Sequence, residues 1–366
     1  MQRVMVMIGF ILLIVSGCRS DAAESPLPIK NNPDYMDKQA APIILPAKTF
    51  YKVVDWENDE SFLFVQQEGS QASIKSYDIN TGDVHKLSSV DGIIVNASLS
   101  PAKKFLLLHL AVDSQTAKVI IMDMENREEI WEKEIRSYDL TYDWNPFNES
   151  QILFTVFQED WEYKVWHADS RTSSWKEIKN LPPFYKWKTK DSVMYQEWKE
   201  GGSESASALM ELYIQNKKVE RIDPAILAFD FMAPYLLTVY VNAETNMYDY
   251  KISQSGKEIS QFFIPGFKVF SDWVIPQHDF IPHTNELIMF KPNTKGVSEF
   301  GEKTFSMVRM DLHTGEEKVI KQTADHAPLA CSPNGSYCLT GHKLSYAVNM
   351  NNGETKQLII YEEEIE

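Results

Sequence analysis

The chain has 366 residues, of which 43% are hydrophobic and 24% are charged. This composition is typical of a folded protein and excludes a polytopic membrane protein, a disordered chain and a collagen-like fibre. The 52 acidic residues exceed the 36 basic ones and give a formal net charge of -16, which argues against binding to nucleic acid phosphates. Three cysteines are too few for a fold that depends on disulfides.

The first residues have the pattern of a secretory signal that ends in a lipid-attachment site. Arg3 precedes the apolar run Val4–Val15, whose roughly dozen residues are too few to cross a bilayer comfortably but fit a signal peptide. The run ends in four residues that resemble a bacterial lipobox: Val15, Ser16, Gly17 and Cys18. In that pattern the thiol of Cys18 receives a diacylglyceryl group, and cleavage makes Cys18 the first mature residue. The alternative is an ordinary signal peptide or a short core helix with a chance cysteine.

These features predict three segments. Residues 1–17 form a lipoprotein signal peptide, residues 18–48 hold the lipidated Cys18 and a proline-rich disordered tether, and residues 49–366 form the folded body. Two or three acyl chains are enough for stable anchoring. The sequence therefore predicts a protein attached by lipid to the extracellular face of the cell membrane.

From Phe50 onward the sequence predicts an all-β body. Short runs rich in Val, Ile, Phe and Tyr, such as Phe105–Val112 and Gln151–Phe157, are of strand length and are separated by polar turns. No window has a long amphipathic helical period.

Tight turns recur along this body roughly every 43 to 51 residues, a spacing typical of propeller blades. They lie at Asn58, Pro101, Pro146, Asp191, Pro234, Pro282 and Pro333. Each unit has room for four short antiparallel strands, and packing the units around an axis covers both faces of every sheet. The spacing predicts a β-propeller of seven blades, with six blades as the alternative. A β-sandwich or a pair of small β domains is the other architecture that this pattern allows.

The lipobox, the proline-rich tether and turns such as Tyr77–Gly82 and Cys331–Gly335 together resemble the YqgU-like propeller lipoproteins of Gram-positive bacteria. That resemblance covers nearly the whole chain and implies a six-bladed propeller. It brings no catalytic residues and no established activity, and only the lipid attachment at Cys18 is carried over residue by residue.

Cys331 and Cys338 flank a predicted turn. If residues 333–336 form its loop, the two cysteines lie opposite each other at a distance that can be adjusted to a disulfide. An extracellular location permits such a bond. The alternative is a pair of reduced, buried thiols.

No other motif predicts a catalytic, metal or cofactor site. His278 and His283 lie five residues apart on a predicted loop, and two ligands do not make a metal site. Ser203, Ser205 and Ser207 lie outside any nucleophile elbow. The acidic stretch Asp55–Glu60 lacks the spacing of a calcium loop.

The nine tryptophans allow two interpretations: packing between blades, or a rim at the propeller mouth that stacks on a sugar or peptide. The sequence favours a non-enzymatic propeller that binds a protein or cell-envelope ligand, because no nucleophile–base or metal constellation is present. The alternative is a propeller hydrolase or lyase whose acidic residues meet in the central channel. A third possibility is a sensor subunit for a membrane partner.

Overall fold

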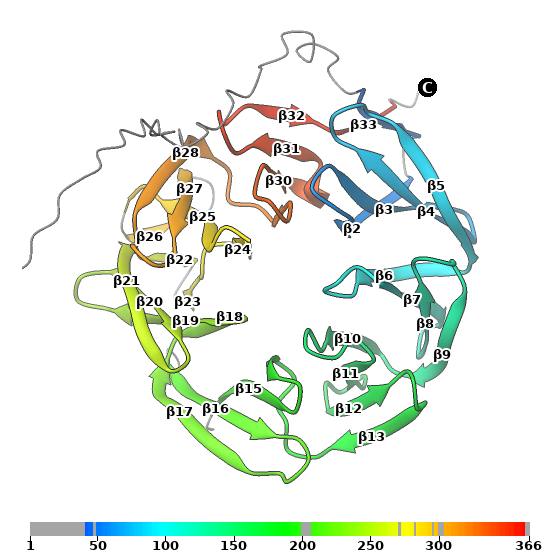
Figure 1. Ribbon diagram of the computed structural model, residues 1–366, viewed down its shortest axis with the longest axis horizontal. Helices are drawn as coiled ribbons and strands as arrows, with labels where there is room; N and C mark the ends of the chain where they lie inside the picture. The colour runs from blue at the N-terminus through cyan, green and yellow to red at the C-terminus, as the bar shows by residue number, and fades with distance from the viewer. Residues whose placement is uncertain are drawn as a thin grey trace, which may run out of the picture. The chain divides into compact units, whose positions relative to one another are not determined.

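The computed structural model of the chain describes residues 41–46, 49–198, 206–269, 272–281, 283–294, 296–298 and 304–362. Seven four-stranded antiparallel sheets, each with its strands hydrogen-bonded in chain order, surround a central opening (Figure 1). The predicted all-β propeller and the count of seven blades are confirmed. Within the described residues, no helix is long and apolar enough to cross a bilayer.

The first four blades follow one another without interruption. Blade 1 contains β2 (Phe50–Trp56), β3 (Ser61–Glu68), β4 (Gln71–Asp78) and β5 (Val84–Asp91). Blade 2 contains β6 (Ile93–Leu99), β7 (Phe105–Asp113), β8 (Thr116–Asp123) and β9 (Glu129–Arg136). Blade 3 contains β10 (Asp139–Trp144), β11 (Gln151–Phe157), β12 (Tyr163–Asp169) and β13 (Ser174–Ile178). Blade 4 contains β14 (Tyr185–Thr189), β15 (Ser192–Glu197), β16 (Ser207–Tyr213) and β17 (Val219–Ile226).

The last three blades complete the ring. Blade 5 contains β18 (Ala228–Met232), β19 (Tyr235–Asn242), β20 (Met247–Gln254) and β21 (Lys257–Pro265). Blade 6 contains β24 (His278–Ile281), β25 (Glu286–Pro292), β27 (Phe305–Asp311) and β28 (Glu317–Ala324). Blade 7 contains β29 (Leu329–Cys331), β30 (Tyr337–Thr340), β31 (Tyr346–Asn349) and β32 (Thr355–Gln357), with a 3₁₀ turn at His342–Leu344. A small additional sheet joins β22 (Phe267–Val269), β23 (Asp272–Trp273) and β26 (Gly296–Ser298).

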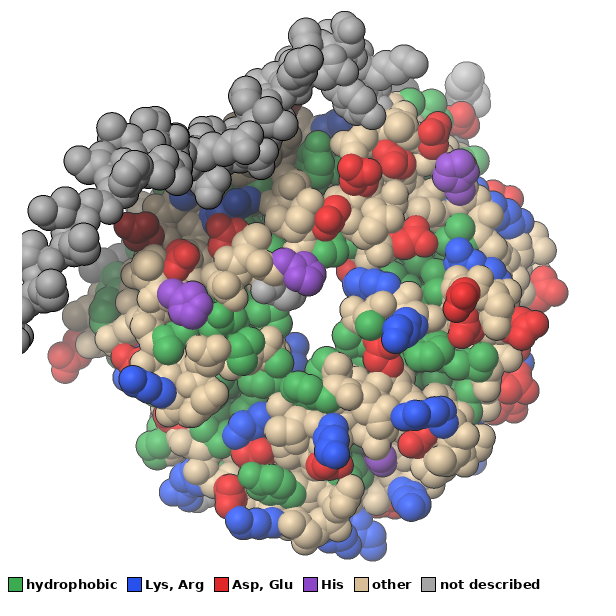
Figure 2. Space-filling model, viewed as in Figure 1, with side chains coloured by type: hydrophobic (Ala, Val, Ile, Leu, Met, Phe, Trp, Pro, Cys, Tyr) green, Lys and Arg blue, Asp and Glu red, His purple; other side chains and the backbone are tan. Residues whose placement is uncertain are grey.

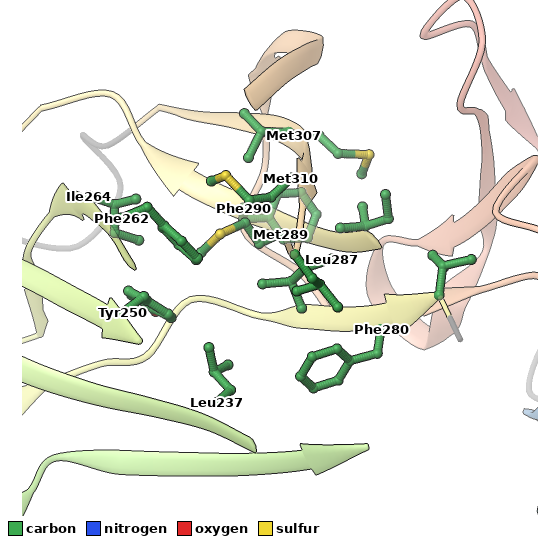
Figure 3. Close-up of a cluster of buried hydrophobic side chains, with 14 of the residues drawn as sticks. Leu237, Tyr250, Phe262, Ile264, Phe280, Leu287, Met289, Phe290, Met307 and Met310 are labelled. Carbon is green, nitrogen blue, oxygen red and sulfur yellow. The ribbon is translucent and has the colours of Figure 1, made fainter. Parts of the chain in front are cut away.

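The second strand of most blades is a continuous apolar run because both of its faces are covered. Five consecutive residues are buried in β3 and in β7, whereas the outermost strands β5 and β9 are largely exposed. Hydrophobic clusters accordingly lie between neighbouring blades rather than within one sheet. Figure 3 shows one such cluster, in which Leu237 and Tyr250 of blade 5 lie near Phe280 and Leu287 of blade 6.

An acidic or amide residue organises the turn between the third and fourth strands of several blades. In blade 1 the carboxylate of Asp78 accepts the backbone N–H groups of Asn80 and Thr81, at 2.8 Å each. Gly82 then takes a positive φ of 80°, which favours glycine. Asp311 and Gly315 repeat this arrangement in blade 6. The turn patterns recognised in the sequence thus mark equivalent places in different blades.

The two ends of the described chain meet in a clasp, which we define as the parallel pair β1 (Ile43–Leu45) and β33 (Ile359–Tyr361). Leu45 is 1% exposed and packs in a cluster with Phe62 of blade 1 and Leu339 of blade 7. The four strands of every blade are paired in the order in which they occur in the chain, so no blade is completed by a strand from the other end. The clasp therefore stabilises the junction at which the ring closes.

The clasp corrects the expected boundary of the tether at residue 48. The structure places Ile43–Leu45 in a strand of the propeller, within the segment 18–48 that composition predicted to be disordered. The local pattern was misleading because the partner of this strand lies at the opposite end of the chain, and its proline-rich surroundings resemble a linker.

Replacement of Leu45 by Ala is expected to lower the free energy of unfolding by about 2–5 kcal/mol, because the side chain is buried between blades 1 and 7. Ile44 is the matched control: it occupies the same strand but is 61% exposed, so Ile44→Ala should have little effect. Urea unfolding followed by circular dichroism measures both. A loss in Leu45→Ala as small as the one expected for Ile44→Ala would contradict a stabilising role of the clasp.

Candidate functional site

The register of the first two strands defines an equivalent position in every blade. In each blade, the third residue of the second strand pairs with one residue of the first, innermost strand. We call the seven residues of the innermost strands that take part in this pairing the inner rung. They are Asp55, Ser98, Asp143, Lys186, Asp230, Asp279 and Ala330. The innermost strands surround the opening of the ring, which remains visible in Figure 2.

Each inner-rung residue contacts the next blade. The carboxylate of Asp55 pairs with Lys103 of blade 2, and Lys186 pairs with Asp230 of blade 5 at 3.1 Å. Asp230 also lies 3.4 Å from Nε2 of His278 in blade 6. The rung is therefore first of all a set of polar connections between blades.

The remaining residues of the inner rung also contact the next blade. Asp279 of blade 6 accepts the backbone N–H of Cys331 in blade 7 at 2.7 Å. The other three accept an indole N–H from a tryptophan that directly follows a rung residue of the next blade. Trp56 donates to the carbonyl of Ala330 at 3.0 Å, Trp144 to Ser98 Oγ at 3.0 Å, and Trp187 to the carbonyl of Asp143 at 3.2 Å.

Burial and neighbouring charges set the ionisation of the rung. Burial raises the pKa of Asp143 to about 6 and that of Asp279 to about 7. Burial also opposes the charge of Asp230, but His278 and Lys186 outweigh it and hold the pKa of Asp230 below its ordinary value. Although burial would lower the pKa of Lys186, Asp230 and Asp143 raise it overall. Around pH 7 the Lys186–Asp230 pair is therefore charged.

Asp143, like Asp279 and unlike Asp55 and Asp230, has no ion pair with a cation within the described residues. It also lines a cleft of about 820 Å³ between blades 3, 4 and 5. The cleft, as we use the term, is lined by Thr141, Tyr142, Asp143, Tyr163, Pro182, Pro183, Phe184, Tyr185, Lys186, Gln196, Trp198 and Phe229. A volume in this range is typical of small-molecule sites.

The rim of the cleft is aromatic and open to solvent. Phe184 is 75% exposed and Trp198 is 55% exposed, and Tyr163 is also exposed. All three lie at the same end of the blades, and we call this end the cleft face. It holds the connections from the second strand of a blade to the third and from one blade to the next. Exposed apolar side chains that gather around a cleft mark interaction sites, whereas ones scattered singly are ordinary surface.

The structure separates the two interpretations of the tryptophans. Trp56, Trp144 and Trp187 are buried between blades, as the packing interpretation predicts. Trp161 and Trp198 are exposed on the cleft face, as the rim interpretation requires. Both roles therefore occur in this protein, at different positions of the repeat.

The remaining residues singled out in the sequence do not converge on a second site. Cys18 and the lipobox residues Val15, Ser16 and Gly17 lie outside the described residues, as do Ser203 and Ser205. His278 is committed to Asp230, whereas His283 is exposed on a turn. Across the ranges that the structure describes, no group of three or more His, Cys, Asp or Glu side chains is arranged to hold a metal ion.

Cys331 and Cys338 occupy opposite positions in β29 and β30 and are joined as a disulfide, with their Cα atoms 3.9 Å apart. The bond lies beside the rung, because the N–H of Cys331 is the donor to Asp279. The acidic stretch Asp55–Glu60 is structural: Asn58 caps its own turn, and Asp59 accepts the N–H of Asn334 in blade 7.

Sequence reasoning missed the rung and the cleft. One signal was available: a charged residue followed by tryptophan shortly before a blade turn occurs as Asp55–Trp56, Asp143–Trp144 and Lys186–Trp187. The aromatic rim gave no such signal, because its members come from loops of different blades.

A family model described as "YqgU-like 6-bladed beta propeller domain" matches residues 78–341. The chain belongs to this family. The matched range holds the whole of blades 2 to 6 and parts of blades 1 and 7, whereas the structure has seven four-stranded blades. The seventh blade is thus a departure from the description of the family.

Two of the similar proteins are described as uncharacterized, and a third shows similarity of fold alone. The "Uncharacterized lipoprotein YqgU" of Bacillus subtilis (strain 168) is 24% identical over 312 residues, which are 85% of each chain. The structure of the uncharacterized protein lmo1340 of Listeria monocytogenes EGD-e superimposes with a TM-score of 0.81 at 18% identity, covering 88% of this chain and 98% of that one. The β-propeller domain of the Trilobed protease from Pyrococcus furiosus gives a TM-score of 0.53 at 12% identity, covering 86% and 99%.

Substitution of Asp279 by Asn is expected to remove part of the pH dependence of stability. Because the folded-state pKa is raised to about 7, the folded protein keeps this proton while the unfolded chain loses it, so the wild type loses stability as the pH rises from about 4 to about 7. An Asn at this position still accepts the N–H of Cys331 and carries no charge. The free energy of unfolding of the variant minus that of the wild type should therefore be larger at pH 8 than at pH 5.

The measurement is urea unfolding at the two pH values. Asp160→Asn is the control, since it removes an exposed carboxyl group whose oxygen accepts a local backbone N–H. Wild-type and Asp279→Asn stabilities that change in parallel with pH would contradict the assignment.

Proposed function

We propose that this chain is a lipid-anchored, extracytoplasmic binding protein whose cleft face holds a protein or cell-envelope ligand. The observation that carries the proposal is the concentration of exposed apolar side chains on one end of blades 2 to 4. These residues are Ile93, Val95, Val112, Tyr138, Trp161, Tyr163, Phe184 and Trp198. Exposed apolar side chains gathered at the end of the blades that holds a cleft are typical of an interaction site.

The polar side chains beside this surface support the same conclusion. A second hollow of about 460 Å³ adjoins Tyr138 and is lined by polar residues, among them Arg136, Gln158 and Glu159. Apolar and aromatic contact area surrounded by hydrogen-bonding groups is the usual composition of a binding surface.

The proposed location rests on the lipobox and on the relatives. The B. subtilis protein is named a lipoprotein, and Cys18 is preceded here by the small residues that such an attachment site requires. We propose that acyl chains on Cys18 hold the propeller at the extracellular face of the cell membrane and that the residues between Cys18 and the clasp act as a tether. The net charge of -16 supports a lipid anchor over a basic membrane-binding patch, because anionic lipid repels an acidic body.

A second candidate function is that of a hydrolase or lyase. It is favoured by two rung carboxyl groups, Asp143 and Asp279, whose pKa values of about 6 and about 7 suit general acid–base catalysis. If this function is correct, purified protein should release soluble fragments from cell-envelope polymers, and Asp143→Asn should stop the release. Binding without any release favours the first function.

Replacement of Cys18 by Ala is expected to release the protein from the membrane fraction and to abolish incorporation of a clickable fatty-acid analogue, because no thiol remains for acylation. Fractionation and in-gel fluorescence of the labelled lipid measure the two effects. Cys338→Ala is the matched control, since it removes a cysteine from the propeller and leaves the lipobox intact. Labelling that persists in Cys18→Ala would exclude this anchor.

A photo-crosslinking amino acid at position 184 is expected to give discrete crosslinked products in intact cells, because Phe184 is the most exposed residue of the cleft rim. The same amino acid at position 147 is the control. Phe147 is 44% exposed but lies in the turn between the first and second strands of blade 3, at the opposite end of the blades. Products of equal yield at both positions would show that the cleft face is not a specific binding surface.

A further inference from the structure

The cleft has an unusually aromatic wall. Six of its lining residues carry aromatic rings: Tyr142, Tyr163, Phe184, Tyr185, Trp198 and Phe229. The face of an aromatic ring carries partial negative charge, so rings that surround a cavity attract a cation placed among them. The attraction is greatest for a weakly hydrated cation, because little solvation is lost when such a cation leaves water.

The same cleft holds one carboxyl group, that of Asp143. Asp143 is partly buried and has no ion pair within the described residues, whereas the other charge in the cleft, Lys186, is bound to Asp230 at 3.1 Å. A partly buried, unpaired carboxylate is costly to maintain, and a ligand cation placed beside it would remove that cost.

We propose that the cleft binds an organic ammonium group, with Asp143 as its counter-ion and the rim residues Phe184 and Trp198 stacked against it. The proposal rests on the function proposed above, in which the cleft is the ligand site, and it specifies the chemistry of the ligand. An anionic ligand fits less well, because the only lysine of the cleft is already paired and three further rung positions are aspartates.

An inorganic cation does not fit this arrangement. Metal ions require several oxygen, nitrogen or sulfur ligands, and the described part of the chain offers no such group. Aromatic rings instead recognise alkylated ammonium groups, whose charge is spread over carbon and hydrogen atoms. Such a group is a quaternary amine, as in choline; the primary ammonium of a lysine side chain is more strongly hydrated and is the weaker candidate.

The test uses isothermal titration of the full lipidated chain in detergent, with choline as the probe. Its neutral isostere 3,3-dimethylbutan-1-ol, in which carbon replaces the charged nitrogen, has the same shape. Choline is expected to bind at least about tenfold more tightly than the isostere. Nα-acetyl-lysine methylamide distinguishes a quaternary from a primary amine as the natural group, and tighter binding of either compound than of the isostere supports the proposal.

Variants locate the site. Asp143→Asn removes the charge with little change of shape, and Trp198→Ala removes an exposed ring, so the fold should be retained in both. Each is expected to weaken choline binding by about tenfold or more. The controls are Glu244→Gln, which removes an exposed carboxylate from the turn between β19 and β20, and Phe147→Ala on the opposite end of the blades. Both should bind choline like the wild type.

The outcomes separate this proposal from the proposed function. Equal binding of choline and its isostere, both weakened by Trp198→Ala, would overturn the ammonium inference and leave the cleft as a binding site for apolar groups. Unchanged choline binding in Asp143→Asn would also overturn it. If neither compound binds and position 184 gives no crosslinked product, the proposed function itself is wrong.

Discussion

A four-stranded sheet with two apolar faces cannot remain alone in water, and this constraint shapes the whole propeller. Each blade buries its second and third strands against its neighbours, so the hydrophobic clusters lie between blades and every blade depends on the next. A row of such blades would leave two uncovered faces, which ring closure removes. The contact between blade 7 and blade 1 is therefore as necessary as any other, although no connection of the chain passes through it.

Closure at that contact uses three kinds of interaction. The clasp pairs the two ends of the described chain, its inward side chains fill the cluster between the blades, and the indole of Trp56 donates to the carbonyl of Ala330. The indole contact repeats what Trp144 and Trp187 do between blades 2, 3 and 4, so closure reuses an interaction that already belongs to the repeat.

The repeated register of the blades also shows which residue of the inner rung can contact a ligand. The same register places one residue per blade on the inner rung, and in most blades that residue is occupied in joining its neighbour. Asp143 also joins its neighbour, because its backbone carbonyl accepts the indole N–H of Trp187, but it is in addition the one acidic residue that lines the cleft. Together with the rim aromatics, the Asp143 carboxyl group distinguishes blades 3 to 5 from the rest of an otherwise repetitive ring.

The fold could be predicted from the sequence because it is encoded locally in every repeat. Turns such as those at Pro101, Pro146 and Pro333 lie between the first and second strands of their blades, and their spacing was sufficient to count seven units. The pairing position of Cys331 and Cys338 followed from the length of one hairpin. The spacing of turns thus fixes blade number without any knowledge of tertiary contacts.

The clasp and the cleft could not be predicted in this way. Ile43 pairs with Ile359 across almost the whole chain, and nothing in either segment reveals the other. The cleft combines Asp143, Phe184 and Trp198 from three different loops and strands, whose proximity depends on how blades 3 and 4 pack. Composition showed many aromatic residues, but only the burial of each one separates the packing tryptophans from those on the rim.

The most direct measurement is a diffraction experiment on crystals soaked with arsenocholine, in which arsenic replaces the nitrogen and scatters anomalously. We expect one dominant anomalous peak inside the cleft, next to the carboxylate of Asp143 and against the ring of Trp198, and its loss in crystals of Asp143→Asn. A dominant peak on another part of the ring, or one that survives in the variant, would contradict it.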